Sequence, residues 1–167
     1  PTRAAEAAYQ ARRVESFSEH ALLPGLVNAH GHAAMTLLRG VADDLPLARW
    51  LQEHIWPRET AHVSSEFVAD GSLLAAAEML RGGITCCNDM YFFPEATAQS
   101  LRRAGMRAMI GLAVLDFPTP YAADPDDYLG KGLAMRDAWR HDPMLRFALA
   151  PHAPYTVGDA TLDRIVT

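Results

Sequence analysis

A chain of 167 residues, half of them apolar and 21% charged, has the composition of one soluble globular domain, which excludes a disordered or fibrous protein. The formal net charge of −5 comes without any basic run, so we expect no nucleic-acid partner. No stretch approaches the roughly 20 consecutive apolar residues of a membrane helix, and residues 1–20 carry charges where a signal peptide needs an apolar core. We therefore expect a cytoplasmic protein without a membrane contact.

The opening segment, residues 1–23, begins with charged residues and contains two short strand-like stretches at 14–17 and 21–23. It is too short to complete a domain. We interpret it as the remnant of a small β domain together with a lead-in to the segment that follows, residues 24–167.

From residue 24 onward, short apolar runs alternate with helical patterns, which is typical of consecutive βα units and a parallel sheet. The predicted strands cover residues 26–30, 84–88, 108–114 and 145–150. None of them alternates cleanly between apolar and polar residues, so each is expected to be buried on both faces. The predicted helices cover residues 46–55, 65–81, 94–105 and 126–140, and a last one opens at 159. Ser64 or Ser65 can cap the second of these, and Gly82 can stop it.

Four βα units in a row predict an α/β fold, the N-terminal half of a (β/α)8 barrel of the TIM type. Eight such units make a barrel of about 250 residues, whereas four cannot close a sheet on themselves. A flavodoxin-like open sheet is the structural alternative. Such a sheet would not need the leading β segment or the long connection at residues 40–63. Loops of that length in compact domains are usually functional.

His30 and His32 stand at the end of the first predicted strand, on either side of a glycine. In an extended chain, residues two apart face the same side, so both imidazoles can point at one metal ion. A His-x-His pair also arises by chance, but a barrel places its catalytic groups at the carboxyl ends of its strands, where this pair lies. Catalytic zinc usually takes three protein ligands, so two histidines are only part of a site.

Several short motifs follow one another along the chain: LLPGLVNAHGH at 22–32, LLRG at 37–40, Trp50, WPRE at 56–59, GGIT at 82–85 and APHAPYT at 150–156. In this order they resemble the amidohydrolase superfamily, and within it the methylthioadenosine and S-adenosylhomocysteine deaminases and their triazine hydrolase relatives. The resemblance covers nearly the whole chain from residue 21 onward.

The resemblance implies that His30 and His32 bind a metal, that Glu59 contacts the nucleoside sugar, and that His152 touches the substrate near the reacting centre. His152 also follows the fourth predicted strand, next to a turn that would fix its direction. Glu59 alone would more often be a solvated carboxylate, although a charged acceptor suits a pair of ribose hydroxyls. Trp50 can wall the purine pocket by stacking, or can be a core residue.

The implied reaction is the hydrolytic deamination of a purine nucleoside, a small-molecule substrate, by attack of metal-bound hydroxide. The resemblance places a third metal-binding histidine, a proton-shuttling glutamate and an aspartate at the fifth strand and beyond, outside this sequence. Residues 145–152 lack the lysine that two-metal members carboxylate, so we expect one divalent metal, Zn²⁺. We expect the full-length protein to be a homo-oligomer.

Two alternatives stay open. One is another amidohydrolase reaction, namely guanine or cytosine deamination or triazine dechlorination, although a free base or triazine has no vicinal diol for Glu59 to hold. The other is an inactive fragment that lacks the remaining metal ligands and serves as a binding module. Cys86 and Cys87 are interpreted as reduced structural residues, and Asp89 faces the same mouth as the histidines without an implied catalytic role.

Overall fold

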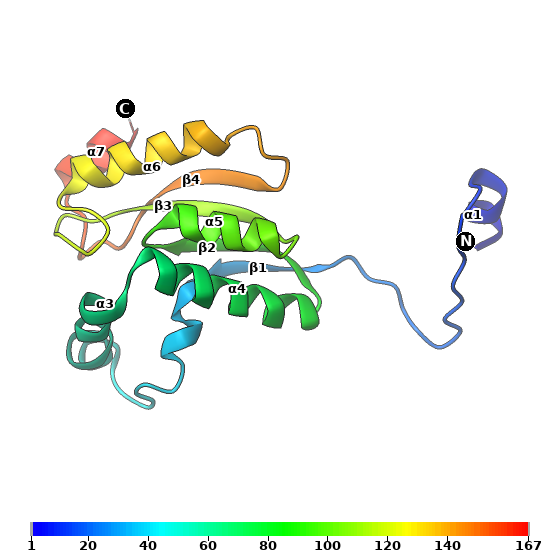
Figure 1. Cartoon of the computed structure of the whole chain (residues 1–167), viewed down its shortest axis with the longest axis horizontal. Helices are drawn as coiled ribbons and strands as arrows, with labels where there is room; N and C mark the ends of the chain where they lie inside the picture. Colours follow the sequence, from blue (N-terminus) through cyan, green and yellow to red (C-terminus); the bar gives the residue numbers. More distant parts are fainter. Residues whose placement is uncertain (1, 167) are drawn as a thin grey trace.

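The structure, a computed structural model, describes residues 2–166. Four strands form one parallel sheet in the order β1-β2-β3-β4, so that each strand pairs with the next one along the chain. Their bounds are Leu26–Gly31, Ile84–Tyr91, Arg107–Val114 and Leu145–Pro151. Figure 1 shows this sheet with its connecting helices, and the amino-terminal segment extending away from it. All four predicted strands are confirmed, and β2 continues to Tyr91, past its predicted end at residue 88.

Three connecting helices pack on one face of the sheet. Their bounds are Ser65–Arg81 for α4, Pro94–Arg103 for α5 and Pro125–Trp139 for α6. One hydrophobic core joins them to alternate residues of β3, since Ala76, Leu101 and Met135 of the three helices share a cluster with Ile110 and Leu112. A consecutive strand order with helices on one face is the arrangement of a barrel, whereas a flavodoxin-like sheet reverses its order and carries helices on both faces. The predicted fold class is confirmed.

Three helices begin at residues whose side chains favour a helix start. Ser64 Oγ accepts a hydrogen bond from the Phe67 amide at 3.2 Å, which selects Ser64 over Ser65 as the cap of α4. Asp124 caps α6 in the same way through the Asp127 amide, and Pro94 is the first residue of α5. The last predicted helix is α7 (Asp159–Val166).

The lead-in differs from its prediction. Helix α1 (Thr2–Ala8) occupies its start, and neither 14–17 nor 21–23 forms a strand in the described part of the chain. A strand needs a neighbour to satisfy its backbone N–H and C=O groups, and no other segment lies against these residues in Figure 1. The expected strands are therefore wrong, while the division of the chain at residue 23 stays a prediction.

The expected burial of every strand on both faces is also wrong. Strand β3 is mostly buried, but β1 is an edge strand whose Leu26 and Val27 are 59% and 65% exposed. Within residues 2–166, β1 pairs with β2 alone and β4 pairs with β3 alone. A strand with one neighbour and an incompletely covered surface keeps apolar residues in contact with solvent.

The long connection between β1 and α4 folds into four short helical pieces. They are the 3₁₀ helix η1 (Ala33–Leu38), α2 (Leu47–Arg49), the π-helical η2 (Trp50–Ile55) and α3 (Trp56–His62). The predicted helical piece at 46–55 is confirmed, and α3 was not predicted. No helix within residues 2–166 is both long and apolar enough to cross a membrane.

Candidate metal and substrate site

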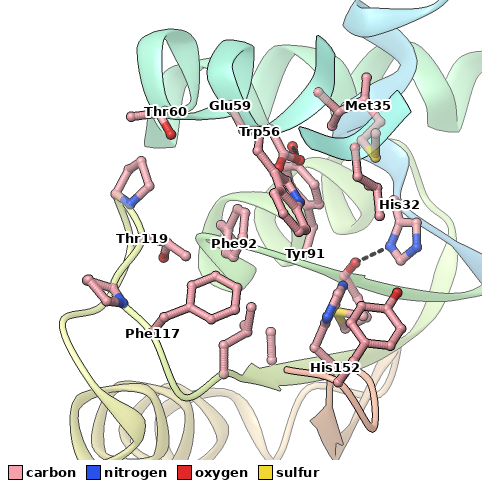
Figure 2. A pocket seen from close by; sticks show the side chains of 18 of the residues that line it. His32, Met35, Trp56, Glu59, Thr60, Tyr91, Phe92, Phe117, Thr119 and His152 are labelled. Carbon is pink, nitrogen blue, oxygen red and sulfur yellow. Dashed lines mark hydrogen bonds between the residues drawn. The ribbon is translucent and has the colours of Figure 1, made fainter. Parts of the chain in front are cut away.

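A cavity of about 330 Å³ lies at the carboxyl ends of the strands. Its walls come from the β1–α4 connection, from the ends of β2 and β3, and from the residues that follow β3 and β4. Figure 2 shows His32 and His152 near one end of this cavity, and Phe117 and Thr119 near the other. The lining is mostly aromatic and aliphatic with a few polar groups, which is the usual composition of a small-molecule site.

The two candidate metal ligands lie together. The ring centres of His30 and His32 are 5.1 Å apart, with the ring planes at 82°. Two imidazoles that bind one tetrahedral zinc ion at about 2.0–2.1 Å place their ring centres roughly 5 Å apart, so this geometry fits a shared ion. His32 lines the cavity, whereas His30 is exposed and stands outside its lining.

A backbone carbonyl orients His32. Its Nδ1 lies 2.6 Å from the carbonyl oxygen of Met90. Because a carbonyl only accepts, Nδ1 donates, and in the neutral ring the lone pair is then on Nε2. A ligand histidine fixed through its other nitrogen in this way is the common arrangement at metal sites. Within residues 2–166, no set of three or more His, Cys, Asp or Glu side chains is arranged to hold a metal ion.

Asp89 ties the loop after His32 to the sheet. Its side chain is 2% exposed, and Oδ1 accepts a 2.5 Å hydrogen bond from the Ala33 amide. Burial raises the pKa of this carboxyl to about 6, although the Ala33 amide and the charge of His32 act in the opposite direction. Asp89 therefore fixes the backbone next to a candidate ligand, a structural role that the sequence did not predict.

Glu59 reaches the cavity from α3 and meets Tyr91 at the end of β2. The Tyr91 hydroxyl donates to Glu59 Oε1 at 2.6 Å. Burial raises the pKa of Glu59 above its ordinary value, while the Tyr91 hydrogen bond and then the charge of His32 lower it. The result is a half-buried carboxylate with one strong donor.

His152 follows β4 and lines the cavity opposite α3. Its backbone amide donates to the Val114 carbonyl, and its Nδ1 lies 2.9 Å from the hydroxyl of the buried Thr156. Burial lowers the pKa of His152, and the nearby charge of His32 adds to this effect. The neutral form is therefore favoured, with Nε2 left to meet a bound molecule.

The structure brings Trp50, Glu59, His32 and His152 to one cavity and leaves His30 just outside it. Sequence reasoning missed the aromatic part of the wall: Trp56, Tyr91, Phe92 and Phe117. Of these, Trp56 lies within a motif that was recognised, and its ring packs edge-on against that of Phe117 at 6.5 Å. Tyr91 was missed because the second strand was expected to end at residue 88.

The chain is similar in sequence to known proteins. Residues 21–167 match the sequence model of the amidohydrolase family. A 5-methylthioadenosine/S-adenosylhomocysteine deaminase of Teredinibacter turnerae is 55% identical over 157 residues, which are 94% of this chain and 36% of the relative. The chain thus spans about a third of the length of this relative.

Solved structures of similar fold include two zinc-bound enzymes. The crystal structure of an adenosine deaminase from Xanthomonas campestris, with bound zinc, is 56% identical with a TM-score of 0.83, and the match covers 86% of this chain and 33% of that one. An atrazine chlorohydrolase from Arthrobacter aurescens, complexed with zinc, has a TM-score of 0.75 over 86% of this chain and 37% of its own. At 21% identity, this second likeness shows the fold alone.

Proposed function

The chain belongs to the amidohydrolase family, and on this premise we propose that residues 1–167 are the amino-terminal part of a longer metal-dependent deaminase. Its substrates are 5′-methylthioadenosine, S-adenosylhomocysteine or a similar adenosine-type nucleoside. The observation that carries this proposal is the cavity in which the half-buried carboxylate of Glu59 and the histidines His32 and His152 face a common space between aromatic walls. The 55% identity to a deaminase with those substrates in its name supports it.

In this proposal His30 and His32 hold one divalent ion, Zn²⁺. The 5.1 Å separation of their rings and the Nδ1 hydrogen bond of His32 support that role, as does the zinc bound to the Xanthomonas campestris relative. An ion held by His30 and His32 would supply a water of lowered pKa, and so a source of hydroxide at neutral pH. The remaining ligands come from the part of the protein beyond these residues.

Glu59 holds the sugar. An ionised carboxylate accepts hydrogen bonds from the two hydroxyls of a ribose, and such charge-assisted bonds are stronger than neutral ones. Trp50 lines the same space and supplies a flat apolar surface for the purine. These contacts leave the amino-bearing ring carbon to face the histidine end of the cavity.

His152 binds the heterocycle near the reacting carbon. Its backbone and Nδ1 contacts fix the ring, and its lowered pKa keeps it neutral, so it can hydrogen-bond the purine without adding a charge beside the metal site. Water is consumed and ammonia is released, which converts the adenine ring to hypoxanthine. A cytoplasmic location and a homo-oligomeric assembly stay predictions of the sequence.

A substrate panel tests the proposal on the full-length protein. Ammonia release is measured with 5′-methylthioadenosine, adenosine, adenine, guanine, cytosine and a chlorinated triazine, the last by chloride release. We expect turnover of the two ribosides. Turnover restricted to a free base or to the triazine would select another amidohydrolase reaction, because those molecules offer no diol to Glu59.

Two variants separate the roles of the polar residues in the same assay. Glu59→Ala should raise KM for the ribosides roughly 10-fold to 100-fold, the range expected for losing a hydrogen bond to a charged group. His152→Ala should mainly lower kcat, since His152 lies nearer the reacting carbon. Glu66→Ala removes an exposed carboxylate from the first turn of α4 and serves as the control. Unchanged riboside affinity in Glu59→Ala would contradict the assignment.

A further inference from the structure

Among the residues that the structure describes, one hydrogen bond connects α3, which carries Glu59, to the end of strand β2. Tyr91 is 6% exposed, and its hydroxyl donates to Glu59 Oε1 at 2.6 Å. Within residues 2–166, no other group donates a hydrogen bond to this carboxylate. Helix α3 has seven residues and packs mainly against η2, its neighbour in the sequence. The Tyr91 bond is therefore the contact that fixes where the Glu59 side chain lies relative to the sheet.

The Tyr91 ring is itself held in place. It belongs to a hydrophobic cluster with Ala34 of η1 and Val63 at the end of α3, and its ring centre lies 5.1 Å from that of Phe92. The His32 ring is 6.5 Å away from it. Tyr91 thus contacts both the residue proposed to hold the metal and the residue proposed to hold the sugar. It lies on strand β2, whose pairing with β3 continues as far as Tyr91.

We propose that Tyr91 is a positioning residue: its hydroxyl orients the Glu59 carboxylate towards the sugar and so sets the preference for ribosyl over dideoxyribosyl ligands. This inference rests on the proposed function of Glu59 and deepens it. Oε1 keeps one lone pair after accepting from Tyr91, and Oε2 keeps both, so two sugar hydroxyls can still be accepted. The Tyr91 bond leaves the carboxylate with fewer orientations, and less entropy is then lost when a diol binds.

The ionisation of Glu59 also indicates that the Tyr91 hydroxyl favours diol binding. Burial favours the neutral acid form of Glu59. In that form one carboxyl oxygen carries the proton, so the group accepts fewer hydrogen bonds and binds a diol more weakly. A hydrogen bond donated to the ionised form favours that form, and burial beside Glu59 keeps the Tyr91 phenol protonated because its pKa is raised. Tyr91 therefore remains a donor over the whole physiological range of pH.

The experiment compares the affinities of the full-length protein for inosine and 2′,3′-dideoxyinosine by calorimetry. These molecules differ only in the diol, and deamination does not consume them. The preference is the ratio of the Kd for dideoxyinosine to the Kd for inosine. In Tyr91→Phe this ratio should be about tenfold smaller than in the wild type, the size expected for one hydrogen bond to a charged group. Affinity for dideoxyinosine should not change, which also shows that the site is folded.

Two further variants show whether Tyr91 acts through Glu59. Tyr128→Phe is the matched control, because Tyr128 is another buried tyrosine whose hydroxyl has a hydrogen-bond partner, Thr119, and no contact with Glu59. It should keep the wild-type preference. Glu59→Gln should lose the preference, and adding Tyr91→Phe to it should cause no further loss, since a residue that acts through another is non-additive with it.

The pH dependence supplies a second readout. Because the Tyr91 bond lowers the pKa of Glu59, its removal raises that pKa, and inosine binding should weaken at a higher pH in Tyr91→Phe than in the wild type as the solution is acidified. The affinity for dideoxyinosine should not follow this change.

The outcomes distinguish the inference from the function on which it rests. If the wild type prefers inosine and Tyr91→Phe keeps that preference, or weakens both ligands equally, the inference is wrong and the function of Glu59 stands. Additive losses in the double variant would also overturn it. If the wild type binds both ligands equally or neither, the sugar-binding role of Glu59 is wrong, and the role of Tyr91 falls with it.

Discussion

Asp89 is a buried carboxyl group whose ionisation opposes folding. Its pKa is raised from 3.8 to about 6 by burial, so between these values the folded protein binds more protons at this site than the unfolded chain does. The free energy of unfolding should therefore fall by roughly 2–3 kcal/mol as the pH rises from about 4 to about 6, and it should stay at this lower value at higher pH. The hydrogen bond from the Ala33 amide offsets part of this cost.

Asp89→Asn tests this balance in the metal-free protein. Asparagine keeps an acceptor for Ala33 but does not titrate, so the variant should gain stability over the wild type as the pH rises from 4 to 7. Urea unfolding at several pH values measures the difference. A wild type and variant with parallel pH dependence would show that Asp89 ionises as freely in the folded protein as in the unfolded chain.

The sequence marks candidate site residues where a motif contains them, and their functional roles stay predictions. The spacing of His30 and His32 on a strand, together with the family pattern, makes them candidate ligands, and the family pattern alone singles out Glu59, while His152 also follows a predicted strand. The partners of these residues were not predicted, because Tyr91, Thr156 and the Met90 carbonyl come from distant positions that only the folded sheet brings near. An alternation signal did exist for one of them, since Tyr91 follows Asp89 by two and faces the same side of β2.

Elements were predicted well where local chemistry determines them. Ser64, Asp124 and Pro94 set the starts of α4, α6 and α5, and the apolar runs set β2, β3 and β4. The lead-in and the burial of β1 were predicted wrongly because both depend on neighbours, which a run of apolar residues does not specify. Helix α3 was missed because its segment lacks an apolar period.

The packing of α4 against η1 depends on a glycine. A Cβ at Gly71 would lie 2.4 Å from the Ala34 carbonyl oxygen and 2.9 Å from the Ala34 Cα, and both are backbone atoms that cannot rotate away. This close approach holds η1, and with it the loop after His32, against the body of the protein. The glycine is needed for space, since its conformation is that of an ordinary helical residue.

Gly71→Ala should destabilise the protein by about 1–3 kcal/mol, as overpacking usually does. Gly130→Ala is the control, because Gly130 lies exposed in α6 with no atom within 4 Å of the position of an added Cβ. That change should stabilise by about 0.5–1 kcal/mol through helix propensity alone. Unfolding in urea gives both values, and equal shifts for the two variants would show that α4 and η1 are not in close contact in solution.

At the scale of the whole molecule, the sheet has two free edges. Strands β1 and β4 each pair on one side only within the described residues, and the apolar Leu26 and Val27 of β1 face solvent. A closed barrel pairs every strand with two neighbours. Residues 1–167 are therefore expected to self-associate when produced alone, because unpaired edges and exposed apolar residues favour association.

The proposed metal site is divided in the same way. His30 and His32 supply two nitrogens, and catalytic zinc sites usually take three protein ligands. Glu59 and His152 line the same cavity. In the proposed function they bind and orient the substrate, and the remaining metal ligands come from the rest of the longer protein. Neither part alone is expected to catalyse deamination.

The most direct test measures bound zinc and ammonia release from 5′-methylthioadenosine for the full-length protein and for residues 1–167, after dialysis of both. We expect the full-length protein to keep one zinc ion per chain and to turn over the nucleoside, while residues 1–167 keep far less zinc and release no ammonia. Stoichiometric zinc with turnover by residues 1–167 alone, or a zinc-loaded full-length protein that deaminates no nucleoside, would contradict it.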